Sequence, residues 1–116
     1  MTTLLERRQT PEYNCAHFVA DVFEQEAGQD VRHALLSFLA RPNTRTATMR
    51  TVKPAFECLP APRDPCVVLF RRAKATPHVG VYLRGRVFHL TPEGAIRQPL
   101  HVAELGYTSV RFYAVR

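Results

Sequence analysis

The sequence predicts an α+β domain in which N-terminal helices pack on one face of a small antiparallel β-sheet. Two observations favour this class. Apolar residues recur with helical spacing up to residue 40, and short apolar runs separated by turn residues follow from residue 66. The chain has 116 residues, of which 46% are hydrophobic and 22% charged, values typical of one globular domain. We therefore expect residues 1–116 to form a single domain.

The longest predicted helix runs from residue 14 to residue 27. Asn14 is a favourable N-cap, and Gly28 suits the position just after a helix. Residues 1–9 are typical of a short helical lead-in, and Thr10-Pro11 suits either a helix start or a turn. The apolar stripe of the long helix consists of Cys15, Phe18, Val19, Val22, Phe23 and Ala27.

A second helix is expected from Val31 to Ala40. Asp30 is its predicted cap, and Pro42 ends it because proline cannot continue a helix. Its apolar positions are Val31, Leu35, Phe38 and Leu39.

The stretch from about residue 42 to residue 65 is rich in proline, arginine and threonine and predicts a long loop. Its last four prolines exclude regular helix. A loop of this length is often a lid or a substrate-binding wall, and an irregular excursion without a role is the alternative. Cys58 in this loop receives no role, and Cys66 just after it is expected to pack in the core.

The second half of the chain predicts strands. Residues 66–70 form a continuous apolar run, as in a strand buried on both faces. Residues 78–83 and 86–91 are joined by Arg84-Gly85, which predicts a hairpin with a two-residue turn. The remaining expected elements are a short strand at 95–97, a helical turn at 102–106 and a strand at 110–115 that closes the sheet.

The net charge of +6 is unevenly distributed. The first 30 residues carry six acidic residues and two arginines, and the rest of the chain carries 14 basic and four acidic residues. The acid-free segment from Arg41 to Lys53 would attract a polyanion, such as nucleic acid, an anionic cell-wall polymer or an acidic protein surface. No nucleic-acid-binding motif appears, so nucleic acid is the less favoured partner, and a solvated basic face without a partner is also compatible.

Three cysteines without C-x-x-C spacing predict neither a disulfide framework nor a structural zinc site. Residues 1–8 lack the apolar core of a signal peptide, and no apolar run is long enough to span a membrane. We expect cytoplasmic synthesis without a signal peptide.

Cys15 is the strongest candidate for a catalytic residue. In the first turn of a helix, the positive end of the helix dipole favours the thiolate, which is the nucleophilic form. The alternative is a cysteine that only packs in the core.

Two histidines of the predicted hairpin supply a candidate base and a residue to orient it. The two-residue turn places Gly80 opposite His89, so that His78 and His89 become diagonal neighbours on one face. Gly80, which has no Cβ, would let a helix end approach this face closely. A thiol peptidase needs such a set: a cysteine, an imidazole within reach and a third polar group that orients the imidazole.

These segments resemble, in order, the signatures of the NlpC/P60 cysteine peptidases. The matching segments are Asn14-Cys15-Ala16-His17-Phe18-Val19, Asp64-Pro65-Cys66-Val67-Val68-Leu69-Phe70, His78-Val79-Gly80-Val81-Tyr82-Leu83 and Phe88-His89. The resemblance implies a papain-like domain in which Cys15 is the nucleophile, His78 the base and His89 the orienting residue. It also implies that the Cys15 backbone N–H contributes to an oxyanion hole and that no metal or cofactor is needed.

Members of this family hydrolyse amide bonds in peptidoglycan stem peptides, and compact versions occur in phage tails. The resemblance therefore implies a peptidoglycan peptide, or another anionic amide, as substrate. We expect the substrate to contact Tyr13, Asn14 and His17 beside the thiol, and Arg45 and Arg50 in the basic loop. A chain of this kind is most similar to the phage or prophage type, with tail or assembly proteins as partners and a place in a virion tail or at the cell wall.

The chain departs from the family pattern at three places. Ala16-His17 stands where Ser-Gly is usual, Arg63 stands where Gly is usual, and the spacing from His78 to His89 is one residue shorter. Two alternatives therefore stay open. One is a catalytically inactive structural or interaction module of a tail or secretion assembly, and the other is a thioester-forming acyltransferase.

Overall fold

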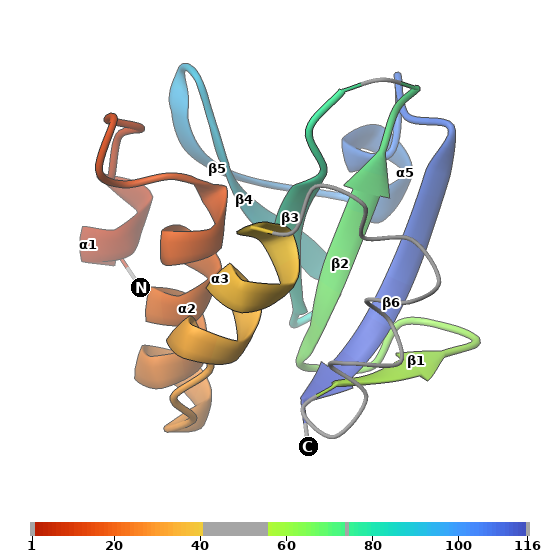
Figure 1. The fold of residues 1–116 in the computed structure, drawn as a ribbon, viewed down its shortest axis with the longest axis horizontal. Coiled ribbons are helices and arrows are strands. Elements are labelled where there is room, and N and C mark those ends of the chain that lie inside the picture. Colours follow the sequence, from red (N-terminus) through yellow and green to blue (C-terminus); the bar gives the residue numbers. More distant parts are fainter. Residues whose placement is uncertain (1, 41–55, 74, 116) are drawn as a thin grey trace.

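A six-stranded antiparallel β-sheet organises the fold (Figure 1). The computed structural model describes residues 2–40, 56–73 and 75–115. The strands are β1 (Phe56–Leu59), β2 (Cys66–Arg71), β3 (His78–Leu83), β4 (Arg86–Thr91), β5 (Gly94–Gln98) and β6 (Ser109–Val115), in the order β1-β6-β2-β3-β4-β5. Together with the helices they confirm the predicted α+β class.

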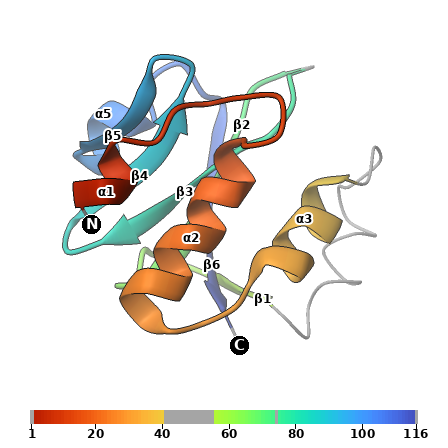
Figure 2. The same cartoon turned by 90° about the vertical axis from the view of Figure 1, so that its left-hand side faces the viewer.

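The helices cover both faces of this sheet, whereas the sequence predicted helices on one face. They are α1 (Thr2–Leu5), α2 (Cys15–Ala27), α3 (Arg32–Ala40) and α5 (Leu100–Ala103). Figures 1 and 2 show α2 and α3 on one side of the sheet and α5 on the other. The reason is an apolar cluster on the second face, where Ala103 of α5 packs with Val68, Phe70 and Val87.

Helix α2 begins and ends close to the predicted residues. The Asn14 Oδ1 atom accepts hydrogen bonds from the backbone N–H groups of Ala16 (2.9 Å) and His17 (3.2 Å), which satisfies two orphan donors of the first turn. Gly28 ends the helix in the left-handed region, with φ of 65°.

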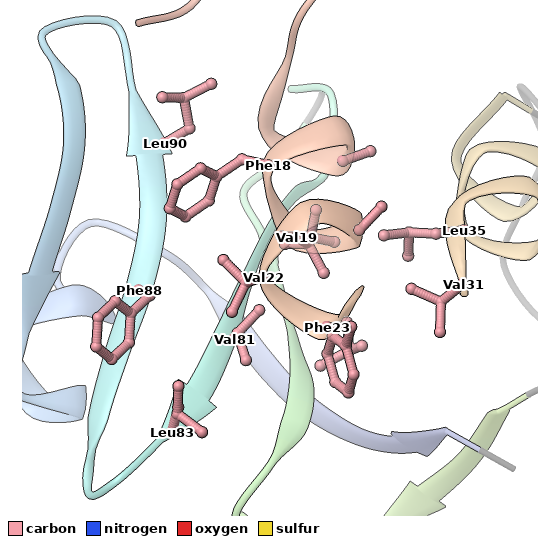
Figure 3. Close-up of a cluster of buried hydrophobic side chains, with 14 of the residues drawn as sticks. Phe18, Val19, Val22, Phe23, Val31, Leu35, Val81, Leu83, Phe88 and Leu90 are labelled. Atoms are coloured by element: carbon pink, nitrogen blue, oxygen red, sulfur yellow. The ribbon is translucent and has the colours of Figure 1, made fainter. Parts of the chain in front are cut away.

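The main core lies between α2 and the sheet. Figure 3 shows side chains of α2 pointing toward β3 and β4 on one side and toward the α3 region on the other. The labelled residues are Phe18, Val19, Val22, Phe23, Val31, Leu35, Val81, Leu83, Phe88 and Leu90, and all of them are buried. Burial of each such side chain stabilises the fold by roughly 1.5–3 kcal/mol, which fixes α2 firmly against the sheet.

Strand β1 lies within the segment that was predicted to be loop. Phe56 to Leu59 pairs antiparallel with β6, from Phe56 opposite Val115 to Leu59 opposite Phe112. The flanking prolines exclude helix but not a short edge strand, because proline is tolerated at such edges. Residues 41–55, with the proposed lid, lie outside the described residues.

Strand β6 and helix α5 also differ from the predictions in detail. Strand β6 begins at Ser109 rather than at residue 110, and it lies between β1 and β2 in the sheet. Helix α5 begins at Leu100 rather than at residue 102, and the Pro99 carbonyl accepts hydrogen bonds from Val102 and Ala103.

The β3–β4 hairpin has the predicted register. Gly80 lies opposite His89, and Leu83 lies opposite Arg86. The two turn residues, Arg84 (φ 53°) and Gly85 (φ 79°), are both in the left-handed region that a tight hairpin turn requires. An Asp64 carboxylate oxygen accepts a hydrogen bond from the Arg84 backbone N–H at 2.9 Å, which ties this turn to the start of β2.

Within the described ranges, no helix has the length and apolar character needed to cross a membrane.

Candidate active site

The Cys15 thiol lies at the start of β3. Its sulfur accepts a hydrogen bond from the backbone N–H group of Val79 on β3. Since Val79 directly follows His78, this contact brings the first turn of α2 to the strand end that carries the candidate base.

Burial raises the pKa of the Cys15 thiol above its ordinary value, and the backbone hydrogen bonds only partly oppose this effect. The thiol is therefore protonated at neutral pH. The helix N-terminus favours the thiolate, but desolvation of the charged form is the largest effect on this pKa.

Three polar side chains form a hydrogen-bonded row across neighbouring strands. The Nε2 atom of His78 on β3 lies 2.8 Å from the Nδ1 atom of His89 on β4. The Nε2 atom of His89 lies 2.7 Å from the Oε1 atom of Gln98 on β5. The diagonal pairing of His78 and His89 is the one that the hairpin register predicted.

Aromatic rings surround this row. The ring of Tyr107 is stacked on the His78 imidazole, with centroids 6.1 Å apart and an angle of 6° between the planes. Phe70 contacts both imidazoles, at centroid distances of 5.6 Å to His78 and 6.0 Å to His89. Only 5% of His89 is exposed, so the middle of the row is buried, whereas His78 and Gln98 at its two ends are half-buried.

Both imidazoles are neutral at pH 7. Burial, followed by the repulsion that Arg72 and a protonated His89 would exert on a second positive charge, lowers the pKa of His78 to about 4. Burial also lowers the pKa of His89, although the hydrogen bond to Gln98 acts in the opposite direction. His78 therefore has an unprotonated ring nitrogen at neutral pH.

The thiol and the imidazoles approach the strand end from opposite faces of the sheet. Helix α2 packs with Val79 and Val81, so the alternation of β3 places His78 on the other face. In the described part of the chain, no hydrogen bond joins Cys15 directly to His78; the thiol bonds to the backbone beside it.

The sequence suggested that Gly80 lets a helix end approach the sheet, but the atoms nearest to its missing side chain belong to β4. A Cβ at this position would lie 3.1 Å from the His89 Cβ, the Phe88 carbonyl oxygen and a Val87 methyl group. The missing side chain therefore makes room for β4, and it allows His89 to lie close to His78.

The residues expected to contact substrate near the thiol take part in the local structure of the α2 start. The Tyr13 hydroxyl donates to Asp21 at 2.6 Å. Asn14 caps the helix, and its backbone N–H donates to the Nδ1 atom of His17 at 3.1 Å. His17 is also stacked on Tyr13. Arg45 and Arg50, which were expected to contact substrate from the basic loop, lie outside the described residues.

The other two cysteines are not part of this site. Cys66 is fully buried at the start of β2, as expected for core packing, and Cys58 is exposed on β1. The described residues contain no group of three or more histidine, cysteine, aspartate or glutamate side chains that could hold a metal ion.

The sequence prediction missed Gln98. An amide does not titrate and is not a usual catalytic group, and the last hairpin strand was expected to end at residue 97. The turn at residues 92–94 could have revealed this residue. It places Thr91 opposite Gly94 and Val87 opposite Gln98, which makes Gln98 a diagonal neighbour of His89.

Fold and site together define a small α+β domain with a helix-terminal thiol next to a histidine-histidine-glutamine row. Comparisons with models of protein families, with curated proteins and with solved structures find no match. The likeness to NlpC/P60 peptidases therefore depends on the motifs described above.

Proposed function

We propose that this protein is a cysteine peptidase or amidase of the NlpC/P60 type, with Cys15 as nucleophile, His78 as general base and His89 as the residue that orients His78. One observation carries the proposal: the Val79 N–H donates to the Cys15 sulfur, so the thiol lies beside the strand residue that begins the His78–His89 row. A lone buried cysteine that only filled the core would not need this neighbour.

The first chemical step starts from a neutral thiol and a neutral imidazole. In this mechanism the S–H group of the thiol donates to the Nδ1 atom of His78 when substrate is bound, as catalytic hydrogen bonds often form or tighten only in the complex. As the sulfur attacks the amide carbonyl carbon, its proton passes to His78. The imidazolium then protonates the leaving amine, and the acyl group stays on sulfur as a thioester.

Water resolves the thioester in the second step. His78 takes a proton from the attacking water and returns it to the departing sulfur, which releases a carboxylic acid and restores the thiol. Because Asn14 occupies the N–H groups of Ala16 and His17, the Cys15 N–H is the donor of this turn that we assign to the oxyanion.

The substrate class follows from the family resemblance. We propose amide bonds of peptidoglycan stem peptides as substrate and a phage or prophage tail as the setting, reached after synthesis in the cytoplasm. The basic residues of the segment 41–53 would attract an anionic cell-wall polymer.

The proposal is tested by mass spectrometry of muropeptides after purified peptidoglycan is incubated with the parent protein and with Cys15→Ala. We expect new free carboxyl and amino ends with the parent and none with Cys15→Ala, and the exposed Cys58→Ala variant serves as the matched control. Equal products from the parent and Cys15→Ala would refute the catalytic role. Transfer of the acyl group to an added amine, without release of carboxylate, would identify an acyltransferase instead.

A catalytically inactive module is the second candidate, because the thiol is protonated and bonds to backbone rather than to His78. Alkylation of Cys15 by iodoacetamide separates the two. If His78 acts as the base, His78→Ala slows alkylation of Cys15, whereas in an inactive module the alkylation rate depends on burial alone and stays unchanged.

A further inference from the structure

We propose that Gln98 is a positioning residue that fixes the tautomers of both histidines, and thereby gives His78 a basic Nδ1 atom. The catalytic consequence of this inference rests on the proposed function, but the assignment of the tautomers does not.

The three side chains occupy one face of three neighbouring strands. His89 lies opposite Gly80 on β3 and opposite Ile96 on β5, while His78 and Gln98 are each displaced by two residues from those positions. Residues displaced by two share a face, and diagonal neighbours are within reach of long side chains. The row His78–His89–Gln98 is therefore fixed by the register of two consecutive hairpins.

The direction of the hydrogen bonds follows from the acceptor at the end of the row. With the Gln98 carboxamide oriented so that Oε1 lies 2.7 Å from the Nε2 atom of His89, Oε1 can only accept, and Nε2 carries the proton. In a neutral imidazole the other nitrogen then has a lone pair, so His89 Nδ1 accepts a proton from His78 Nε2 at 2.8 Å. His78 Nδ1 is consequently left without a proton and can act as a base.

An amide suits this position better than a carboxylate. A carboxylate next to His89 would favour the imidazolium, which would introduce a charge beside the Phe70 ring at a residue that is almost fully buried. The neutral amide sets the orientation of both protons while both imidazoles stay uncharged. His78 then keeps an unprotonated Nδ1 atom at neutral pH.

The test uses long-range ¹H–¹⁵N correlation spectra of the protein labelled with ¹⁵N-histidine at pH 7. In the parent protein we expect His78 and His89 each to show a single tautomer with the proton on Nε2. In Gln98→Met, which removes the acceptor, we expect both residues to shift to mixtures of tautomers. Gln98→Glu restores an acceptor and is expected to return His89 to a protonated Nε2 atom.

The matched control is Arg97→Met on the same strand. The guanidinium of Arg97 is exposed and lies over Phe88, which belongs to the opposite face, so this variant is expected to keep the parent spectrum. A proton on Nδ1 of either histidine in the parent would overturn the inference, even if Gln98→Met failed to fold. An unchanged spectrum in a folded Gln98→Met would overturn it as well.

The activity of the same variants measures the catalytic consequence. If the proposed function holds, we expect kcat/KM of Gln98→Met to fall roughly fivefold to tenfold, the loss that corresponds to one neutral hydrogen bond. If the parent shows the expected tautomers but no activity, the proposed function fails and the role of Gln98 in orienting the histidines stands.

Discussion

Gly80 and His89 lie opposite each other in the β3–β4 hairpin, and a Cβ atom at Gly80 would lie only 3.1 Å from the Cβ atom of His89. The geometry of the candidate base thus depends on a residue that contributes no functional group.

Gly80→Ala is expected to destabilise the protein and to displace His89. The added Cβ would lie 3.1 Å from backbone and side-chain atoms of β4, and overpacking of this kind costs roughly 1–3 kcal/mol. Chemical denaturation measures the loss, and the exposed Arg86→Ala variant in the same hairpin should change stability by less than about 0.5 kcal/mol. A Gly80→Ala protein with parental stability would contradict this account of the hairpin.

The free energy of unfolding should decrease as the pH falls from about 6.5 toward 4. His78 has a folded-state pKa of about 4, below the ordinary value near 6.5, so the unfolded chain binds a proton in this window that the folded protein excludes. The loss from His78 amounts to at most about 3 kcal/mol at pH 4. Urea denaturation at several pH values measures it. His78→Gln should flatten the decrease, whereas substitution of the exposed His33 should leave it unchanged.

The two histidines should differ in their effect on activity. His78→Ala removes the base and is expected to lower kcat/KM by roughly 10²- to 10⁴-fold. His89→Ala leaves the base in place but removes the partner of its Nε2 atom, so a weak residual rate should remain. Rates of muropeptide release measure both, with the exposed His101→Ala as control. Equal losses in the two histidine variants would contradict the assigned order of roles.

Asn14→Ala should weaken α2 without removing a substrate contact. Loss of the cap leaves the N–H groups of Ala16 and His17 without their acceptor and costs about 1 kcal/mol. Asn14→Ser keeps a capping oxygen and should restore most of the stability. If Asn14 only caps the helix, KM in Asn14→Ser stays at the parental value. A raised KM with normal stability would show that Asn14 contacts substrate, as the sequence had suggested.

Local chemistry explains which parts of the fold were predictable. The cap at Asn14, the end of the helix at Gly28 and the Arg84-Gly85 turn each depend on neighbouring residues, and they were predicted correctly. Strand β1 was not predictable in this way, because Glu57 and Cys58 show no apolar alternation and its partner is the distant strand β6. The insertion of β6 between β1 and β2 is likewise a property of non-local pairing.

In the candidate site, too, the contacts set by local register were predictable and the contact set by tertiary packing was not. The diagonal contact of His78 with His89 follows from counting residues back from one turn, and Gln98 could have been found by counting from the next turn. The position of Cys15 could not be found by counting. The alternation of β3 is the same whichever face α2 covers, and only packing places the helix on the Val79 face.

The position of β6 also affects the order in which the sheet can assemble. Strands β2 to β5 each pair with a strand that is adjacent in sequence, so these pairs can form early in folding. Strand β1 and the outer edge of β2 both pair with β6, which is distant from them in sequence. Until β6 arrives, the apolar β2 strand presents an open edge on which another chain could dock. During synthesis or refolding at high concentration, we expect chaperones to bind, or aggregation to begin, at this unpaired edge of β2.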